Sequence, residues 1–583
     1  MNRLSLKAHL LYACLLVAIC AATYWTSLGG DFVLDDQYQI VGNIAIRDLR
    51  NIPAAFVLPA WSFLRGPCAD PAHAREDVCR STSLNYYRPV QTALFTIAYA
   101  IGALDPFYYH LLNVILHCIA TLFIYFLCLE LPLAAGSAIV AAMLFAVHPV
   151  HTEAIAWIAC TGELACGAFY FAALWTFVKF VKTQSTRWMF VSAGFFLVAL
   201  LSKEMAVTLP LVALGLTLIY RKWQVTSKEL VLSLFSYAVA FGVYVYLRVL
   251  AVGLTIAPAH FMAGFVDWIT LGISVLGRYL WFVVIPFPLS AYHSIPIPLA
   301  ERWTEVLIAA AAIGILASCF NRSWRRGSNA ALWFCIFLIT LIPVFNFKAI
   351  VNGVYFSERY LYIPSFAAII AGVLLLPSVP KKYATVLTCI VVGAFGVLAA
   401  MRNLTWRDNE TLFRTILERN PQATQFWTAL GIVEIDKGNL DYATLCYENA
   451  LRQVTYLQNP GIDNGELYRI HLGLGTIAAR RQNYPSAKSH FESAMRAYPR
   501  GSLSYTYLGG VLLDSGGNPS EAISLLQHAI DLNSGDEIAR DFMGVALFNQ
   551  GRTQDAVRSF QEALRINPRF KEAQNHLNLV IGK

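Results

Sequence analysis

Acidic residues that could do chemistry at a membrane surface come directly after the first long apolar run of the chain. Asp31, Asp35 and Asp36 follow the run 10–28 in the string Gly-Asp-Phe-Val-Leu-Asp-Asp. A carboxylate within hydrogen-bond reach of a hydroxyl can take its proton as a general base, and neighbouring carboxylates can also hold a divalent cation. Asp35 and Asp36 are therefore candidate catalytic residues. The alternative is a polar flank, or a turn, where the chain leaves the membrane.

A second polar group interrupts apolar sequence further along the chain. His148, His151 and Glu153 share one short turn, and Glu163 follows inside an apolar run. Histidine and glutamate both occur as zinc ligands, although a turn satisfied by its own hydrogen bonds would show the same residues. Carboxylates at membrane depth are costly and tend to face a cavity. A metal site and a hydrogen-bonded turn both stay open as interpretations.

Further charged residues embedded in apolar sequence could bind an anion. Lys203 and Glu204 interrupt one apolar stretch, Arg278 lies inside another, and Glu358 and Arg359 stand together before a third. Lysine can meet a phosphate as a point charge, and arginine can bind a lipid phosphate in bidentate fashion. The alternatives are an ion pair between Lys203 and Glu204, and arginines that extend toward the lipid headgroups.

The composition predicts that these residues belong to a membrane domain. Of 583 residues, 57 % are hydrophobic and only 14 % are charged, against roughly a quarter charged in soluble proteins. Long uncharged runs fill residues 10–401, and ordinary amphipathic helix patterns follow. The net charge of +8 fits basic cytoplasmic loops, and the absence of a clustered basic face argues against nucleic-acid binding. We expect a membrane domain over 1–402 and a second domain over 403–583.

The apolar runs predict about 11 to 13 membrane-spanning helices. The run 267–287 could be re-entrant, and 91–102 could span the membrane or lie in its interface. Besides 10–28, the predicted segments are 109–129, 134–149, 153–178, 188–203, 206–220, 229–249, 267–287, 304–320, 331–347, 362–377 and 383–401.

Basic residues before the first run predict a cytoplasmic N-terminus. The loop 30–108 and the C-terminal domain then lie on the outer side. Cys68 and Cys79 fall in this loop, where an oxidising compartment would allow a disulfide between them.

The C-terminal third repeats with a period close to the roughly 34 residues of a tetratricopeptide repeat (TPR). Gly431, Gly475, Gly509 and Gly544 mark the helix crossings of four successive units. Residues 413–421 resemble the second helix of a degenerate first unit, and 571–581 a capping helix. Since each unit buries its apolar face only against its neighbours, the array predicts an α-solenoid with a concave face. Such surfaces bind peptides or proteins, or serve only as spacers. The whole chain is thus predicted to be all-α.

These strings, in this order, resemble the transmembrane and TPR repeat-containing proteins, a family of GT-C type glycosyltransferases implicated in protein O-mannosylation. The family has a Gly-Arg-Ala-Asp-Leu-like string where this chain reads Thr161-Gly-Glu-Leu, so Glu163 could replace the acid while the arginine is missing. The tail is also shorter than in many members. The matching strings are Gly30-Asp-Phe-Val-Leu-Asp-Asp, Tyr87-Arg-Pro-Val, His110-Leu-Leu-Asn-Val-Ile-Leu-His117, Leu144-Phe-Ala-Val-His-Pro-Val-His-Thr-Glu-Ala154, Leu201-Ser-Lys-Glu, Arg278-Tyr-Leu-Trp281 and Ser357-Glu-Arg-Tyr-Leu-Tyr-Ile-Pro-Ser365.

The resemblance implies a polyprenyl-phosphate sugar donor, such as dolichyl- or undecaprenyl-phosphate mannose. It also implies an active site that faces the lumen or periplasm, with Asp35 and Asp36 in the catalytic loop. We therefore expect transfer of mannose to Ser or Thr hydroxyls of proteins. The lipid phosphate or acceptor would be bound by residues drawn from the charged set, which comprises His148, His151, Glu153, Lys203, Glu204, Arg278, Glu358 and Arg359.

The remaining expectations concern partners and place. The TPR groove would hold the acceptor or an accessory protein. The compartment would be a bacterial inner membrane with a periplasmic TPR domain, or the endoplasmic reticulum membrane with a lumenal one. Two alternatives are a non-catalytic, membrane-anchored TPR scaffold and a transferase that acts on glycans or lipids.

Overall fold

The chain is helical throughout the part that the structure describes. This computed structural model describes residues 5–59, 86–131, 133, 135–219, 225–253, 264–295, 299–325, 329–345, 356–375, 381–457 and 464–582. The chain divides into two compact units, one of Met1–Ala60 with Ser83–Leu412 and the other of Trp61–Thr82 with Phe413–Lys583. The all-α prediction is confirmed for these residues. Cys68 and Cys79 lie outside the described residues.

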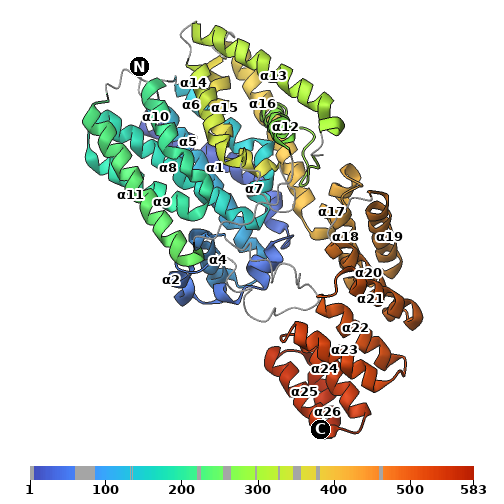
Figure 1. The fold of residues 1–583 in the computed structure, drawn as a ribbon. Helices are drawn as coiled ribbons and strands as arrows, with labels where there is room; N and C mark the ends of the chain where they lie inside the picture. The colour runs from blue at the N-terminus through green and yellow to red at the C-terminus, as the bar shows by residue number, and fades with distance from the viewer. Residues whose placement is uncertain are drawn as a thin grey trace. The chain divides into compact units, whose positions relative to one another are not determined.

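Long apolar helices make up most of the first unit (Figure 1). Seven helical segments among the described residues are long and apolar enough to cross a membrane, or up to eight if the bent pair Gly136–Val147 and Pro149–Ala156 is one span. The helices in these seven segments are α1 (Leu6–Tyr24), α5 (Pro106–Glu130), α8 (Thr161–Thr183), α11 (Ser227–Val252), α12 (Phe265–Val284), α13 (Leu299–Arg325) and α16 (Lys381–Asn403).

Shorter apolar helices complete this unit. They are α4 (Pro89–Gly102), α6 (Ala135–Val147), α9 (Thr186–Ser202), α10 (Leu209–Ile219), α14 (Ala330–Leu341) and α15 (Ser365–Leu375). A total of about 11 to 13 spans requires that the shorter helices cross as well, and stays a prediction. Most of the run 267–287 lies in one continuous helix, α12, which ends at Val284.

One predicted helix begins later than expected. The run 153–178 reads as a single apolar segment, but α8 starts only at Thr161. After α6, a 3-10 turn (Pro149–His151), the short helix α7 (Thr152–Ala156) and a second 3-10 turn (Ile158–Cys160) intervene. Pro149 lacks a backbone N–H and disfavours helical backbone at the residue before it. We call residues 148–160 the broken segment.

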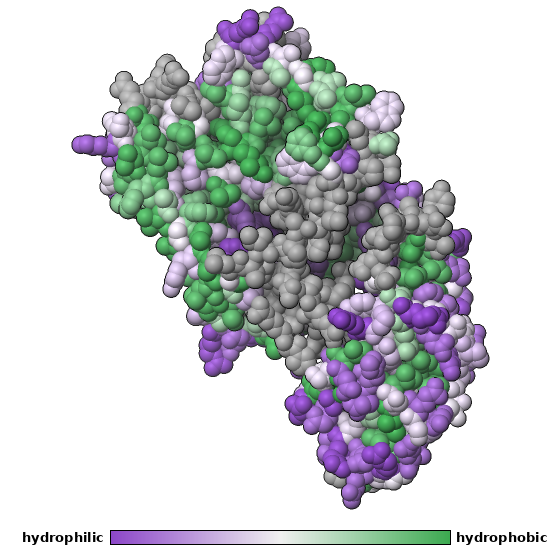
Figure 2. Space-filling model, viewed as in Figure 1, coloured by the Kyte–Doolittle hydropathy of each residue, from purple (hydrophilic) through white to green (hydrophobic). Residues whose placement is uncertain are grey.

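The surface of this unit agrees with a membrane setting. In the view of Figure 2, hydrophobic residues cover much of its surface, whereas the repeat unit is mostly hydrophilic. Large apolar side chains are exposed along α1, α11, α13 and α16, including Leu11, Phe235, Ile308 and Ile390. Such surface would be unfavourable in water and is normal against lipid.

The second unit consists of paired helices, as its sequence period predicts. The four pairs are α18 (Thr424–Asp436) with α19 (Leu440–Leu457), α20 (Asn464–Arg480) with α21 (Tyr484–Ala497), α22 (Ser502–Asp514) with α23 (Pro519–Leu532), and α24 (Glu537–Asn549) with α25 (Thr553–Ile566). Helix α17 (Asn409–Arg419) precedes them, and α26 (Lys571–Ile581) has the predicted bounds of the capping helix.

A glycine at each crossing lets the two helices of a pair approach closely. A Cβ atom added at the first-helix glycine would come too close to a large side chain of the second helix. The distances are 2.6 Å from Gly431 to Tyr447, 2.6 Å from Gly475 to Phe491, 2.8 Å from Gly509 to Leu526 and 2.5 Å from Gly544 to Phe560. The spacing of these glycines therefore reports helix packing.

Replacing Gly544 by alanine should loosen the last pair. The added methyl group would collide with the buried ring of Phe560, and such overpacking costs about 1–3 kcal/mol, more than the roughly 1 kcal/mol that alanine adds to helix stability. Amides of α24 and α25 should exchange faster with deuterium, as read by mass spectrometry. Gly194→Ala in α9 has open space around it and serves as the control. Unchanged exchange in α24 and α25 would contradict this packing argument.

Candidate functional site

Asp36 is fully buried and its carboxylate is bound to backbone on both sides. One oxygen accepts a hydrogen bond from the N–H of Val33 at 3.0 Å, and the other from the N–H of Ala159 at 2.7 Å. Burial raises the pKa of Asp36, and these N–H groups offset the rise only in part. Asp36 thereby fastens the loop after α1 to the broken segment.

Asp35 lies beside it but has a partly exposed side chain. The turn that precedes the two carboxylates contains Leu34 in the left-handed region, with φ 49°, which is costly for a bulky residue. The N–H of Leu34 donates to the side chain of Asn409 at 2.9 Å. The turn thus directs Asp36 inward and leaves Asp35 the more accessible of the two predicted catalytic residues.

The predicted histidine turn is held by hydrogen bonds. His148 Nε2 lies 3.1 Å from the carbonyl oxygen of Val283, and its Nδ1 accepts from the N–H of Val150 at 3.3 Å. His151 Nδ1 lies 2.9 Å from the carbonyl of Phe145, and its Nε2 lies 2.8 Å from the Ser365 hydroxyl. All four ring nitrogens have protein partners, which favours the interpretation as a hydrogen-bonded turn.

Among the described residues, no group of three or more His, Cys, Asp or Glu side chains is placed so that it could hold a metal ion. A divalent cation at Asp35 and Asp36 stays a prediction.

Side chains of neighbouring helices bind the free backbone groups of the broken segment. The Asn113 amide on α5 donates to the carbonyls of Ile155 and Trp157 at 3.1 and 3.3 Å. The Gln91 amide on α4 donates to the carbonyl of Ala159 at 3.0 Å. Irregular backbone at membrane depth must be satisfied within the protein, so these contacts are what permits the helix to break here.

The carboxylate of Glu153, in the broken segment, binds both the side chain and the backbone N–H of Arg359. Its Oε1 lies 2.5 Å from Arg359 Nη1 and accepts from the Ser357 hydroxyl at 2.6 Å, while its Oε2 accepts from the Arg359 N–H at 3.0 Å. The guanidinium of Arg359 also lies 5.0 Å from the ring centroid of Trp157. Arg359 is thereby fixed in orientation.

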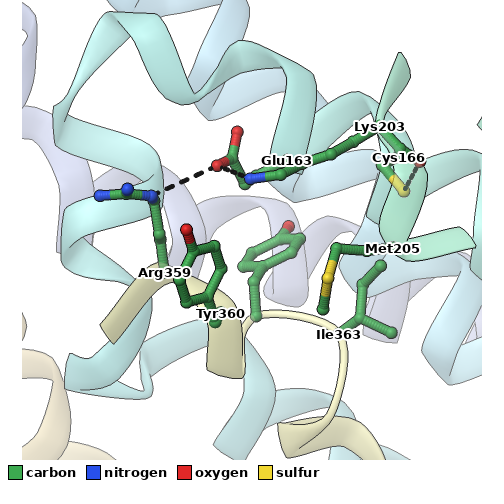
Figure 3. Close-up of a pocket in the computed structure, with 8 residues that line it drawn as sticks. Glu163, Cys166, Lys203, Met205, Arg359, Tyr360 and Ile363 are labelled. Atoms are coloured by element: carbon green, nitrogen blue, oxygen red, sulfur yellow. Dashed lines mark hydrogen bonds and ion pairs between the residues drawn. The ribbon is translucent and has the colours of Figure 1, made fainter. Parts of the chain in front are cut away.

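Glu163, in the first turn of α8, lies between two cations (Figure 3). Its Oε1 forms an ion pair with Lys203 Nζ and lies 3.5 Å from Arg359 Nε. All three residues line one pocket, together with Cys166, Met205, Tyr360, Tyr362 and Ile363. The predicted candidates Lys203 and Arg359 are therefore brought together in space.

The alternative in which Lys203 and Glu204 pair with each other is wrong, since Lys203 pairs with Glu163. Helix α9 ends at Ser202 and Lys203 is extended (φ −161°, ψ 147°), so the adjacent side chains diverge. Glu204 instead lies 3.6 Å from Arg88 Nη2. Arg88 belongs to the matching string Tyr87-Arg-Pro-Val but was not predicted as a site residue. A charged residue beside the first turn of an apolar helix, such as Arg88 before α4, is costly to leave unpaired, and this is the signal that could have identified it.

Six residues define what we call the ion-pair network. Its carboxylates and cations are equal in number, so the network is balanced in charge when all are ionised. The members are the connected group Glu153, Glu163, Lys203 and Arg359, and the separate pair Arg88 and Glu204.

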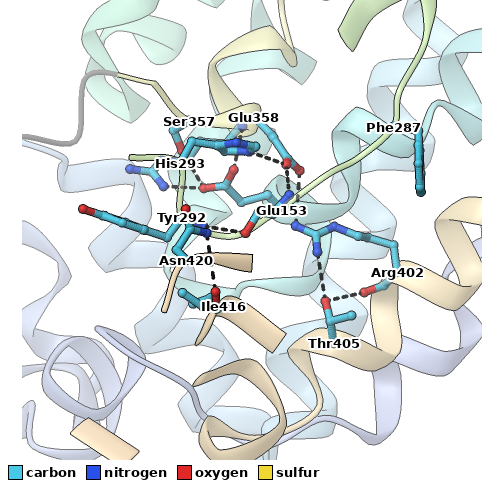
Figure 4. Close-up of polar contacts among 12 residues, drawn as sticks. Glu153, Phe287, Tyr292, His293, Ser357, Glu358, Arg402, Thr405, Ile416 and Asn420 are labelled. Carbon is cyan, nitrogen blue, oxygen red and sulfur yellow. Dashed lines mark hydrogen bonds and ion pairs between the residues drawn. The ribbon is translucent and has the colours of Figure 1, made fainter. Parts of the chain in front are cut away.

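Glu358 belongs to a different set of contacts (Figure 4). Its Oε1 accepts from the N–H of Ser290 at 2.6 Å and lies 2.9 Å from His293 Nε2, while its Oε2 lies 3.4 Å from Arg402 Nη2. Glu358 is fully buried. We call Glu358, His293 and Arg402 the second network, and neither His293 nor Arg402 had been predicted as a site residue.

Arg278 is placed apart from the pocket. It forms a bidentate pair with Glu305, at 2.6 and 3.0 Å, between α12 and α13. The pocket lining does not include it. The structure therefore gives Arg278 a structural partner and does not bring it to Lys203 and Arg359.

Comparisons with known proteins concern the chain as a whole. Tetratricopeptide repeat families match residues 472–537 and 539–570. The mouse protein O-mannosyl-transferase TMTC3 is 25 % identical over 95 % of this chain and 63 % of its own. The mouse protein O-mannosyl-transferase TMTC1 is 38 % identical over 28 % of this chain and 16 % of its own. The chain is thus similar to TMTC proteins over nearly all of its length.

The chain spans 63 % of the length of mouse TMTC3. A TMTC relative from Drosophila melanogaster, protein O-mannosyl-transferase Tmtc3, is 23 % identical over 83 % of this chain and 59 % of its own. Solved TPR structures also match, among them YrrB, with 24 % identity, 29 % of this chain and 82 % of that chain covered, and a TM-score of 0.23. The predicted resemblance to the transmembrane and TPR repeat-containing family is confirmed.

Replacing Asn113 by leucine should destabilise the first unit of this protein. The buried carbonyls of Ile155 and Trp157 would lose their donor, and each unsatisfied buried group costs about 1–3 kcal/mol. The melting temperature of the detergent-solubilised protein, followed by scanning fluorimetry, should fall. The control variant Asn321→Leu, at an exposed position of α13, should leave the melting temperature unchanged. Equal melting temperatures for the two variants would mean that the broken segment is held by other contacts.

Proposed function

We propose that this chain is a membrane glycosyltransferase that moves mannose from a polyprenyl-phosphate carrier to Ser or Thr hydroxyls of proteins on the extracytoplasmic side. Its homology to proteins named O-mannosyl-transferases over nearly the whole chain carries the proposal. A partly exposed acidic residue after α1 and a pocket that contains Lys203 and Arg359, in one compact unit, support it.

Asp35 acts as the general base in this proposal. The acceptor oxygen attacks the anomeric carbon of the sugar, the bond to the lipid phosphate breaks, and the acceptor proton passes to the Asp35 carboxylate. Asp36 is the positioning residue, because both of its oxygens bind backbone N–H groups. Its hydrogen bonds fix the turn on which Asp35 stands.

The pocket supplies the donor site. Lys203 offers a point charge to the phosphate, and Arg359 offers a planar guanidinium already oriented by Glu153 and Trp157. Lys203 follows α9 directly, and Arg359 lies in the 3-10 turn Glu358–Leu361. Holding donor and acceptor in fixed orientation supplies much of the rate enhancement.

The TPR unit holds the acceptor or an accessory protein in its concave face. The repeats matched by family comparison and the four helix pairs support a protein-binding surface. In this proposal the N-terminus is cytoplasmic and the repeats lie in the periplasm of a bacterium or the lumen of the endoplasmic reticulum. A non-catalytic scaffold is the second candidate, favoured by the same repeats.

Replacing each aspartate by asparagine tests the proposal. Asp35→Asn should lower transfer by about 100-fold or more, the usual contribution of a general base, with no change in melting temperature. Asp36→Asn should lower both transfer and melting temperature, because an amide nitrogen cannot accept a hydrogen bond from Val33 or Ala159. Purified protein, a polyprenyl-phosphate-mannose donor and extracytoplasmic protein extract are combined, and hexose on Ser or Thr is read by mass spectrometry.

Two outcomes would count against the enzyme. If Asp35→Asn transfers sugar as well as the wild type, Asp35 is not the base. If the wild type adds no sugar from several lipid-linked donors while it still captures proteins through its repeats, the scaffold is the better account.

A further inference from the structure

The pocket that would receive an anion already contains one, contributed by the protein. Glu163 lies between Lys203 and Arg359, and its Oε1 contacts both cations (Figure 3). A phosphate oxygen bound by the same two cations would have to occupy much the same place. The protein carboxylate and an incoming phosphate would therefore compete for these cations.

Glu163 is held less completely than the neighbouring carboxylate. Both oxygens of Glu153 have hydrogen-bond donors, including the Arg359 backbone N–H and the Ser357 hydroxyl. Glu163 is 7 % exposed, yet its Oε2 has no hydrogen-bond partner in the described protein. A buried carboxylate oxygen without a donor is unfavourable, so Glu163 is the less firmly held of the two carboxylates that contact Arg359.

The charge balance of the network leads to the same residue. With three carboxylates and three cations, the network has no net attraction for a further anion. Two of the carboxylates have a role that a phosphate could not take over, since Glu153 holds the Arg359 backbone and Glu204 is paired with Arg88 away from the pocket lining. Only Glu163 can give up its cations without loosening either contact.

We propose that Glu163 is a built-in placeholder for the phosphate group of the donor, and that its carboxylate must leave Lys203 and Arg359 before the phosphate binds there. The inference rests on the proposed function, because it assigns the ligand of the same pocket. No bond is made or broken in this step; one anion replaces another at the same two cations. Glu163 lowers the affinity for the phosphate and keeps the cations paired while the pocket is empty.

Neutralising Glu163 should therefore tighten phosphate binding. Glu163→Gln in nanodiscs should bind citronellyl phosphate, a short prenyl phosphate, about tenfold more tightly than the wild type, which corresponds to roughly 1.4 kcal/mol. Dissociation constants are taken from the ligand-dependent rise in melting temperature. Citronellol, which lacks the charge, should show no gain. Inorganic phosphate is titrated in parallel, and a gain confined to citronellyl phosphate identifies a lipid phosphate as the ligand.

Glu130→Gln is the matched control. Glu130 also pairs with two cations, Lys179 and Lys182, and also contacts α8, so the variant changes the net charge by the same amount. It should bind citronellyl phosphate as the wild type does. If Glu163→Gln does not fold, Glu163→Asp, which shortens the side chain by one methylene and withdraws it from Lys203, should give a smaller gain.

Each remaining outcome decides the matter. Wild-type binding of citronellyl phosphate with no gain in Glu163→Gln or Glu163→Asp overturns the placeholder and leaves the proposed donor site standing. An equal gain in Glu130→Gln overturns it as well, because net charge would then be the cause. No binding of any phosphate by any of the proteins overturns the placeholder and the proposed donor pocket together. An equal gain for inorganic and citronellyl phosphate supports a placeholder for the phosphate group itself.

Discussion

The first unit depends on the pairing of backbone groups that a broken helix leaves free. Between α6 and α8 the chain runs through turns inside an apolar protein, where water cannot serve as the partner. Asn113, Gln91 and Asp36 reach this segment from α5, α4 and the loop after α1, and bind its carbonyl and N–H groups. Each of these polar residues would be costly if left unpaired, and each has a hydrogen-bond partner in the irregular backbone.

This pairing also explains why the candidate site lies where it does. A continuous helix would carry Glu153 and Glu163 on regular turns, with their backbone groups already bonded. The break instead turns Glu153 toward Arg359 and sets Glu163 in the first turn of α8. A carboxylate there is favoured by the partial positive charge of the helix N-terminus. The polar residues that gather around this one segment lie as far apart in the sequence as Asp36 and Arg359.

The sequence predicts the positions of helices better than it predicts which side chains pair with one another. Apart from the start of α8, the apolar runs identify the ends of the seven long apolar helices in the described residues to within about five residues, and the repeat period identifies the four helix pairs and the bounds of α26. Both signals are local, since they depend on hydrophobic runs and on residues at helix crossings. The start of α8 was missed because the broken segment is as apolar as the helix that follows it, and periodicity does not distinguish the two.

Ion-pair partners could not be predicted, because they depend on tertiary packing. Lys203 and Glu204 are adjacent in sequence, yet the extended backbone at Lys203 sends one to Glu163 and the other to Arg88. His148 and His151 had two interpretations from sequence, and only the positions of distant carbonyls distinguish them. The sequence predicts Asp35 and Asp36 together as candidate catalytic residues, but only the fold shows that Asp36 is the buried one.

Glu358 and Arg359 are neighbours along the chain and belong to different networks, one to His293 and Arg402 and the other to Glu153 and Glu163. A single peptide unit, which is planar and nearly rigid, joins the two. The pocket and the C-terminal end of α16 therefore share a mechanical element. Glu153 binds the backbone N–H of Arg359, so a ligand that displaced this backbone would also move the attachment point of Glu358, whose carboxylate lies 3.4 Å from Arg402 in the last turn of α16.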